Sequence, residues 1–378
     1  MKFIHLSDLH IGKRVNEFSM IEEQKYILLK ILEIIDNSKA EAVMIAGDVY
    51  DKTVPSTEAV ELFDWFVTKL AERNLKIFII SGNHDSSIRV AFASEIMKKC
   101  GVYISPAFSK DIKPTVLNDE YGEINVYMLP FIKPANVRAF YQDEQIDSYT
   151  DAVRIAIENM NVDSAKRNII ITHQFVTGAT RCDSEELSVG GTDNVDVSIF
   201  DNFDYVALGH IHSPQKILRE TVRYSGTPLK YSFSECNHKK SVCVVDMFEK
   251  DNVNIELIPL IPKNDLQKIR GSYMELTAKS FYDELSIENY FHITLTDEED
   301  IPDVISKLRT IYPNIMRIEY DNKRTRSTAH IDSDERIEKQ TPLEIFDEFY
   351  FTQNGSKLSN EQNQMLCDMI EKIWEGNV

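Results

Sequence analysis

Cysteine is scarce in this sequence of 378 residues, and its five cysteines are scattered along the chain. No two of them have Cys-x-x-Cys spacing, so neither a disulfide framework nor a thiolate zinc site is indicated. No apolar run approaches the roughly 20 residues that span a bilayer, which predicts no membrane segment. The first residues read as a strand rather than a signal peptide, so a cytoplasmic location is the default expectation.

Basic residues are also in the minority, with 42 Lys and Arg against 61 Asp and Glu and a net charge of −19. This balance argues against a broad basic surface for nucleic acid on the chain itself. It is compatible with phosphate binding through metal ions, because a bound cation inverts the local field of an acidic site. The sequence lacks the Gly-x-x-x-x-Gly-Lys-Ser/Thr loop of ATPases and the Gly-x-Ser-x-Gly elbow of serine hydrolases, so we expect neither chemistry.

Up to about residue 262, short apolar runs alternate with amphipathic stretches. The apolar runs predict buried strands at residues 3–6, 42–46, 77–80, 124–129, 168–172 and 205–208. Apolar residues at helical spacing predict one helix capped by Ser19 and further helices at 56–73, 88–99 and 148–160. Antiparallel strands at 222–226, 241–247 and 253–259 are expected to complete this part. The alternation indicates an α/β layered domain over residues 1–262.

The remaining chain predicts three smaller parts. Residues 263–322 suggest a small second α/β unit, with a strand at 291–295 and a helix at 301–311. Residues 323–340 are polar and read as a linker. Residues 341–378 predict a helix–turn–helix hairpin, in which Thr341 and Ser359 begin the two helices as caps. The second helix carries an apolar stripe with few residues left to pack against, so we expect it to dock on a partner.

Five short polar motifs stand at the ends of apolar runs. They are Asp8-Leu9-His10, Gly47-Asp48, Gly82-Asn83-His84-Asp85, His173 and Gly209-His210-Ile211-His212. Ligands of open α/β sheets bind beyond the carboxyl ends of the strands, so these loops can converge on one site. The glycines before Asp48, Asn83 and His210 are expected to let the backbone turn sharply at those ends.

The residue types in these motifs suit two divalent metal ions. Carboxylates, imidazoles and one amide oxygen favour Mn, Fe, Mg or Zn over soft metals. Two ions roughly 3.5–4 Å apart can clamp the attacking and leaving oxygens of a phosphoryl displacement. Each motif by itself is weak, and the ordered series carries the prediction of a two-metal phosphoesterase.

This series resembles the calcineurin-like metallophosphoesterases, and nearly the whole chain resembles their SbcD family, the nuclease subunits of bacterial SbcCD complexes. Residues 3–13, 81–86, 205–212, 224–228 and 342–346 carry the closer resemblance. It implies a four-layer β-sandwich flanked by helices, with a small α/β capping domain and a C-terminal helical hairpin. It also implies a metal-dependent nuclease that works in DNA repair, recombination and replication.

Site roles follow from the resemblance position by position. It implies that Asp8, His10 and His212 hold a first metal ion, and that Asn83, His173 and His210 hold a second. Asp48 would bridge the two ions, which are expected to be Mn²⁺. His84 would stabilise the transition state or protonate the leaving oxygen, and Asp85 would orient His84. Many relatives have Arg where this chain has Lys52, so a bidentate phosphate contact is not expected there.

The resemblance also implies partners. An SbcC-type ATPase would receive the C-terminal hairpin, residues 56–73 and 88–99 would form a homodimer interface within a heterotetramer, and the substrate would be double-stranded DNA ends and hairpins. A cytoplasmic, nucleoid-associated location follows. Two alternatives stay open: a metallophosphodiesterase of small substrates, which leaves the C-terminal residues unexplained, and a non-catalytic scaffold, which the intact set of ligands counts against.

Overall fold

The computed structural model describes residues 1–182, 185, 193–323 and 325, together with 343, 346, 347, 350, 351 and 358–375. Within these residues the chain divides into two compact units. The larger unit comprises Met1–Glu185, Asp193–Lys268 and Glu288–His292, and the smaller includes Ile269–Ile287 and residues from Ile293 onward. No helix among the described residues is long and apolar enough to cross a membrane.

The larger unit contains two six-stranded sheets, the first in the order β16-β15-β1-β4-β5-β6. Its strands are β1 (Lys2–Leu6), β4 (Ala42–Ala46), β5 (Lys76–Ile80), β6 (Val102–Ile104), β15 (Ser241–Met247) and β16 (Val253–Pro259). β1, β4, β5 and β6 run parallel, while β15 and β16 join antiparallel. The structure confirms the strands predicted at residues 3–6, 42–46, 77–80, 241–247 and 253–259.

The second sheet has the order β13-β14-β12-β9-β8-β7. Its strands are β7 (Thr115–Asp119), β8 (Gly122–Leu129), β9 (Arg167–His173), β12 (Tyr205–Gly209), β13 (Gln215–Ile217) and β14 (Arg219–Tyr224). The three strands predicted at residues 124–129, 168–172 and 205–208 are confirmed. The strand predicted at 222–226 corresponds to β14 and was expected to be antiparallel. That direction was wrong for its pairing with β12, which is parallel. β13, which the apolar pattern did not reveal, turns the chain so that β14 runs parallel to β12.

A hydrophobic core fills the space between the two sheets. Successive strand residues point to opposite faces, so one face of each strand enters this core. Met44 of β4 and Phe78 of β5 meet Ile169 of β9 and Tyr205 of β12 there, all of them inaccessible to solvent. The alternate residues Val43 and Ile45 of β4 are equally buried on the other face.

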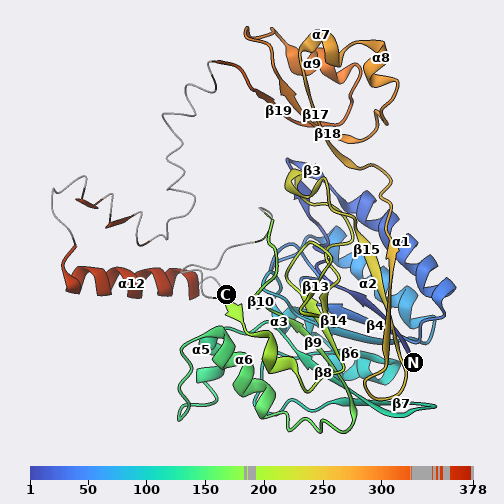
Figure 1. Ribbon diagram of the computed structural model, residues 1–378, viewed down its shortest axis with the longest axis vertical. Coiled ribbons are helices and arrows are strands. Elements are labelled where there is room, and N and C mark those ends of the chain that lie inside the picture. The colour runs from blue at the N-terminus through green and yellow to red at the C-terminus, as the bar shows by residue number, and fades with distance from the viewer. Residues whose placement is uncertain are drawn as a thin grey trace. The chain divides into compact units, whose positions relative to one another are not determined.

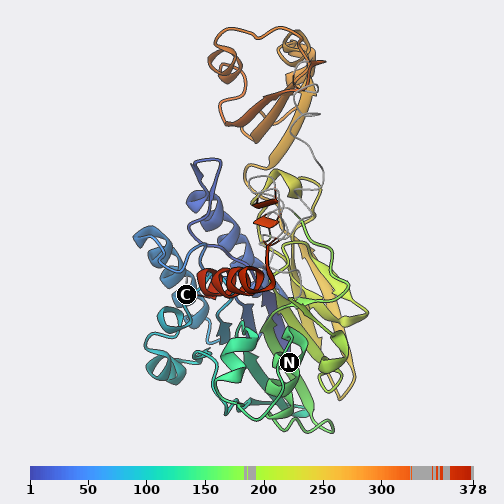
Figure 2. The same cartoon turned by 90° about the vertical axis from the view of Figure 1, so that its left-hand side faces the viewer.

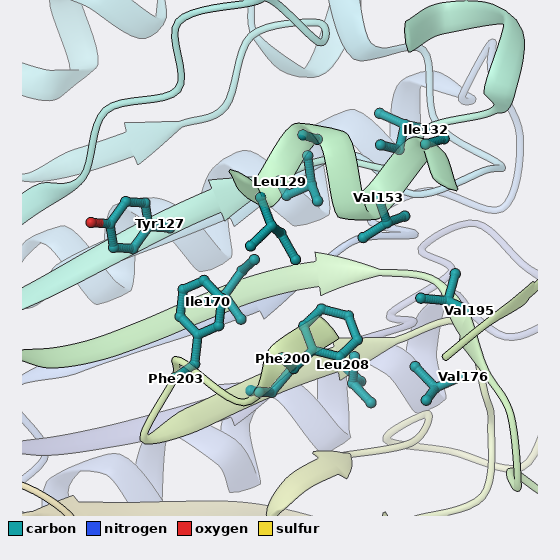
Figure 3. Close-up of a cluster of buried hydrophobic side chains, with 14 of the residues drawn as sticks. Tyr127, Leu129, Ile132, Val153, Ile170, Val176, Val195, Phe200, Phe203 and Leu208 are labelled. Carbon is teal, nitrogen blue, oxygen red and sulfur yellow. The ribbon is translucent and has the colours of Figure 1, made fainter. Parts of the chain in front are cut away.

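Helices cover the outer faces of both sheets. α1 (Ile21–Ser38) and α2 (Thr57–Ala71) bury apolar stripes beside the first sheet, and α5 (Pro134–Arg138) and α6 (Tyr149–Glu158) lie beside the second. Figures 1 and 2 show the blue and green helices on different sides of the strands. Figure 3 shows Val153 of α6 pointing toward Leu129 and Ile170 in this outer layer. The expected α/β fold, with two mixed sheets between helices, is confirmed.

Two helix predictions need correction. The N-cap of α1 is Met20 rather than Ser19, and no side chain caps the helix. The segment predicted as one helix at 88–99 forms three short turns, α3 (Ser87–Val90), α4 (Ser94–Met97) and the 3-10 helix η1 (Lys98–Cys100). Ala93, in the left-handed region at φ 59°, separates α3 from α4. An uninterrupted helix cannot contain such a residue.

Short elements complete the larger unit. They are β2 (Arg14–Val15), β3 (Phe18–Ser19), β10 (Phe175–Val176), β11 (Asn194–Val195) and the 3-10 helices η2 (Val197–Phe200) and η3 (Phe233–Glu235). β2 and β3 form an antiparallel pair, whereas β10 and β11 pair in parallel. The segment between β9 and β12 therefore contains β10, β11 and η2, and part of it lies outside the described residues.

A three-stranded sheet has the order β17-β18-β19. Its strands are β17 (Leu266–Gly271), β18 (Tyr290–Leu295) and β19 (Ile315–Tyr320), with helices α7 (Tyr273–Leu276), α8 (Lys279–Tyr282) and α9 (Val304–Arg309) between them in sequence. β18 confirms the strand predicted at 291–295, and α9 is a shorter version of the helix predicted at 301–311.

The C-terminal helix α12 (Asn360–Glu375) confirms the second helix of the predicted hairpin. Its start has the expected reciprocal cap, in which Ser359 Oγ accepts from the Gln362 amide and Gln362 Oε1 accepts from the Ser359 amide. Nearly all of the predicted linker at 323–340, and most of the first helix with its cap Thr341, lie outside the described residues.

A buried histidine in the core predicts a pH-dependent stability. His5 Nδ1 lies 2.9 Å from the Tyr205 hydroxyl and its Nε2 lies 3.2 Å from the Leu208 carbonyl oxygen. Burial lowers the pKa of His5 to about 3. The unfolded chain binds a proton below about pH 6.5, so the contribution of His5 to stability is complete above that pH and is lost as the pH falls toward 3.

We therefore expect His5→Gln to flatten the acid side of the stability profile. At pH 4.5 the parent should have lost about 2 to 3 kcal/mol through this residue, and the variant should not lose it. Urea unfolding of both metal-free proteins between pH 4.5 and 7.5 measures the difference. Parallel profiles would mean that His5 does not resist protonation in the folded chain.

Candidate metal centre

The predicted site residues meet at the carboxyl ends of five strands. Asp8 and His10 follow β1, Asp48 follows β4, and Asn83 and His84 follow β5 in the first sheet. His173 ends β9, and His210 and His212 follow β12 in the second sheet. β1, β4 and β5 are parallel neighbours, as are β9 and β12, so the loops of each sheet emerge at one edge.

Three glycines allow these strand ends to approach closely. Gly47 has φ 84°, so it turns the backbone as expected. Gly82 and Gly209 were also expected to supply turns, but neither has a positive φ. A Cβ on Gly82 would lie 2.1 Å from Asp48 Oδ1, and one on Gly209 would lie 1.8 Å from the Ala46 carbonyl oxygen. Their role is to leave space between backbones rather than to provide a turn.

The backbone itself is strained at the site. Asp8, His10, Asp48 and His210 all have positive φ, with values of 52°, 43°, 47° and 104°. Residues other than glycine adopt such angles at a cost of order 1–3 kcal/mol each, and such outliers cluster at functional sites. Backbone hydrogen bonds hold this loop region, since the Asp8 amide donates to Gly47 and the His10 amide to Asp48.

Asp8, His10 and His212 form the first donor group. One ligand atom from each lies within 4.8 Å of the others, and all three residues are buried. The Nε2 atoms of His10 and His212 face each other at 3.2 Å. Asp8 is fixed by the backbone amide of His210, which donates to both of its carboxylate oxygens. Two nitrogens and a carboxylate aimed at one small region fit a divalent cation.

Asn83, His173 and His210 form the second donor group. The Asn83 Oδ1 atom lies 2.9 Å from both His173 Nε2 and His210 Nδ1. His173 is oriented by its other nitrogen, since Nδ1 lies 2.8 Å from the Ala46 carbonyl oxygen. Phe131 stacks beside His210, and Phe175 contacts the same ring at its edge.

Asp48 lies between the two donor groups. Its Oδ2 atom is 3.4 Å from His173 Nε2 and 3.7 Å from His10 Nε2. Oδ1 accepts a hydrogen bond from the His84 amide at 2.9 Å. The carboxylate therefore faces one histidine of each group, the position that a bridging ligand requires.

The electrostatics of the centre also suit a cation. Burial raises the pKa of Asp8 to about 6, and burial lowers the pKa of His10 and His210 well below the usual value. Burial opposes ionisation of Asp48 too, but His173 and His84 outweigh it and hold its pKa well below the usual value. Burial also disfavours the charged form of His173, but Asp48 outweighs it and raises the pKa of His173 to about 9. A centre of buried carboxylates in which His10 and His210 are neutral gains stability from bound cations.

His84 lies at the edge of the donor groups, with a ring nitrogen within 4.8 Å of ligand atoms of His10 and Asp48. Its side chain is 19% exposed, whereas those of His10 and His173 are at most 1% exposed. Its Nε2 is 4.0 Å from Asp48 Oδ2, so the ring borders the centre and remains open to an incoming molecule. This placement suits a group that touches substrate.

The structure corrects the expected role of Asp85. We expected this carboxylate to orient His84, but it accepts from the backbone amides of Val49, Tyr50 and Gly82. The His84 Nδ1 atom faces the Asp51 carbonyl oxygen instead, at 3.1 Å. Asp85 therefore ties the loop after β4 to the loop after β5, and it supports Asp48 and Asn83 rather than the His84 ring.

Asp51 and Lys52, which follow Asp48 in sequence, differ in their surroundings. Asp51 forms an ion pair with Lys13 at 2.7 Å and lies 4.0 Å from His10 Nδ1. Lys52 is exposed to solvent.

Residues outside the predicted motifs also support the centre. Gln24 Nε2 donates to the His10 carbonyl oxygen, and Tyr231 donates to that of Leu9. Glu235 Oε1 lies 3.3 Å from His212 Nδ1, and Lys240 forms an ion pair with Glu235. These side chains sit in segments with no metal-ligand spacing, so the sequence carried no local signal for them.

Two facing mixed sheets with clustered Asp, Asn and His side chains at their strand ends define the dinuclear metallophosphoesterase class. Residues 1–214 match the calcineurin-like phosphoesterase family, and residues 262–354 match the type 5 capsule protein repressor C-terminal domain. The chain belongs to the calcineurin-like phosphoesterase family. The fold and the donor groups together support a site for two divalent metal ions.

Within this family the chain is similar over its full length to the SbcD subunits of SbcCD nucleases. It is 33% identical to that of Staphylococcus epidermidis and 31% identical to that of Staphylococcus saprophyticus, with 99% of each chain covered in both cases. A crystal structure of a dimetal phosphatase from Danio rerio overlaps with a TM-score of 0.41 at 9% identity, covering 69% of this chain and 96% of that one. The family assignment rests on the sequence matches, because that overlap is low.

Proposed function

We propose that this chain is the nuclease subunit of an SbcCD-type complex, a metal-dependent hydrolase of phosphodiester bonds at double-stranded DNA ends and hairpins. The proposed processes are DNA repair, recombination and replication. The observation that carries the proposal is the convergence of six metal-donor side chains around a seventh, Asp48, with His84 beside them. The full-length relatives, which are named as SbcCD nuclease subunits, support DNA as the substrate.

The proposed ligand assignment follows the two donor groups. Asp8, His10 and His212 would hold one ion, Asn83, His173 and His210 would hold the other, and Asp48 would serve both. The ions, which we propose to be Mn²⁺, supply Lewis-acid activation of water and charge neutralisation at the phosphate. The protein orients two of the donor side chains. His173 is held by its contact with the Ala46 carbonyl oxygen, and Asp8 by the hydrogen bond from the His210 amide.

We assign His84 to proton transfer or charge stabilisation at the leaving oxygen. The His84 ring is more open to solvent than those of His10 and His173, and its Nδ1 faces the Asp51 carbonyl. A proton on Nδ1 would satisfy that carbonyl and leave Nε2 facing the centre. This geometry lets Nε2 exchange a proton with a bound phosphodiester.

The proposed domain organisation is a nuclease domain at 1–262, a capping domain at 263–322, a linker at 323–340 and a partner-docking segment at 341–378. Met365 and Met369 of α12 are 67% and 52% exposed, which supports docking of this helix on an SbcC-type ATPase. The capping domain is proposed to orient DNA. A cytoplasmic, nucleoid-associated location is part of the same proposal, because chromosomal DNA is the substrate.

A homodimer within the heterotetramer is also proposed. Ile88, Phe92 and Ile96 in the region of α3 and α4 are 79%, 80% and 69% exposed. Exposed apolar side chains close together in sequence are typical of interaction surfaces. They support the expectation that the segments 56–73 and 88–99 meet a second copy.

The test compares the parent with His84→Gln on end-labelled duplex DNA with Mn²⁺, in the presence of the SbcC-type ATPase and ATP. We expect His84→Gln to lower the rate about 10²- to 10⁴-fold, because a positioned proton donor contributes that much. The content of bound Mn²⁺, measured by elemental analysis, should stay at the parental value, because His84 is not assigned as a ligand.

Other outcomes point elsewhere. Cleavage of a chromogenic phosphodiester but not of DNA by the parent complex would favour a small-substrate metallophosphodiesterase. A parent that binds no divalent metal would instead favour a scaffold without catalytic activity. A His84→Gln variant that cuts DNA at the parental rate would remove the assigned role of His84.

A further inference from the structure

His212 is held by buried polar groups that lie outside the predicted motifs. Its ring Nδ1 is 3.3 Å from Glu235 Oε1. Its carbonyl oxygen accepts a hydrogen bond from Lys240 Nζ at 2.9 Å, and its amide donates to Glu185 Oε1 at 2.7 Å. The ring and the backbone of this one residue are therefore fixed from several directions.

Glu235 and Lys240 form a buried ion pair beside His212. Their side chains are 0% and 3% exposed. The Lys240 ammonium contacts Glu235 Oε2 at 2.5 Å, Thr227 Oγ1 at 2.6 Å and the His212 carbonyl oxygen, which uses its three donors. Desolvating two charges is costly, and a fully satisfied network of this kind rigidifies the groups that it contacts.

Among the described residues, the other histidines of the two donor groups have no carboxylate at hydrogen-bond distance on the side away from the metal site, and Asp51 Oδ1 is 4.0 Å from His10 Nδ1. His173 Nδ1, the ring nitrogen that faces away from Asn83, lies 2.8 Å from the Ala46 carbonyl oxygen. His10 Nδ1 has no hydrogen-bond partner in the described part of the chain. A carboxylate acceptor fixes the tautomer and ring orientation of a metal-binding histidine more firmly than a carbonyl does. The first donor group thus depends on Glu235 in a way that the second does not.

We propose that Glu235 and Lys240 are a positioning pair that fixes His212 and thereby sets the affinity of the first donor group for its metal ion. Glu235 accepts the Nδ1 proton of His212, which leaves the Nε2 lone pair facing Asp8 and His10. Lys240 supplies the positive charge that balances Glu235. Its ammonium also fixes the Glu235 carboxylate relative to the His212 backbone, because it donates to both. The inference rests on the proposed two-metal function and adds a residue pair that acts on one of the two ions.

The test measures Mn²⁺ binding to the Glu235→Gln variant by calorimetry and by electron paramagnetic resonance. The His212 ring faces Glu235 Oε1 and the Lys240 ammonium faces Oε2, and in glutamine an NH₂ group that cannot accept replaces one of these two oxygens. We expect one ion to bind about 10- to 100-fold more weakly and the other to keep its parental affinity. At low Mn²⁺ the spectrum should change from that of a coupled pair to that of an isolated ion.

Two further variants separate positioning from folding. Asp204→Asn removes another buried carboxylate paired with a lysine, since Asp204 is 1% exposed and lies 2.9 Å from Lys250. Asp204 precedes β12 whereas His210 follows it, so this control lies at the far end of the strand. The double variant Glu235→Gln with Lys240→Met leaves no unpaired buried charge, and it carries the test if the single variant does not fold.

Each outcome decides the proposal. Loss of one ion in Glu235→Gln or in the double variant, with both ions retained in Asp204→Asn, supports it. Two ions at parental affinity in every variant, or equal weakening of both ions in all three, would overturn it. A parent that binds fewer than two ions would refute the two-metal function itself, and that result differs from a failure confined to Glu235 and Lys240.

Discussion

Asp48→Asn is expected to lower phosphodiesterase activity by at least about 100-fold and to weaken the binding of both metal ions together. Loss of a group that merely supports a ligand costs about 10- to 100-fold, so loss of a carboxylate shared by both ions should exceed that range. Asp48 Oδ2 lies 3.4 Å from His173 and 3.7 Å from His10, one histidine from each donor group. Asparagine keeps the shape of the side chain but removes its charge.

His212→Asn provides the contrast for this prediction. His212 belongs to the first donor group alone, so its replacement should weaken one ion and leave the other near its parental affinity. Asp204→Asn, which changes a buried carboxylate at the other end of β12, controls for the loss of a buried charge. Mn²⁺ titration and DNA cleavage measured on all three variants check the pattern. If Asp48→Asn lost a single ion, the carboxylate would not bridge the two groups.

The sequence indicated which side chains converge because each motif is local. A buried strand followed by Asp, Asn or His can be read within a few residues, and parallel strands then bring such ends together without further information. Asp8, Asp48 and Asn83 were found this way. Glu235 could not be, because its contact with His212 depends on how η3 folds back over the loop after β12. Gln24 meets Tyr231 across 207 residues, a contact that no spacing encodes.

Most of the fold was also predictable from the sequence. The prediction of a helix at 88–99 was wrong because it used local spacing alone. Ile88, Phe92 and Ile96 have helical spacing, and the sequence therefore predicted one helix at 88–99. Their side chains are exposed in the described chain, so no packing within it rewards a continuous helix there. Most helical stability comes from burial of an apolar face, and short helices are marginal without it. The direction of β14 was missed because apolar pattern reports burial and not strand orientation.

Gly209→Ala is the second substitution with a large expected effect, because no space exists for a single methyl group. Its Cβ would lie 1.8 Å from the Ala46 carbonyl oxygen and 2.7 Å from His173 Nδ1. The carbonyl belongs to β4 of the first sheet and Gly209 to β12 of the second, so relief requires the two strand ends to separate. We expect a loss of at least about 3 kcal/mol in the free energy of unfolding, at the upper end for overpacking.

The same clash acts on the metal centre. Ala46 O is the contact of His173 Nδ1, and His210 follows Gly209 directly. Separating the strands therefore removes the contact that orients His173 and shifts His210, both of the second donor group. Gly271→Ala is the matched control, since its Cβ would meet only side-chain atoms, the nearest at 3.2 Å, and should change stability by less than about 1 kcal/mol. Urea unfolding by circular dichroism and Mn²⁺ titration measure both effects. Parental stability in Gly209→Ala would show that the two sheets can part at this edge, and the close approach of β4 and β12 would then not be what fixes the histidines.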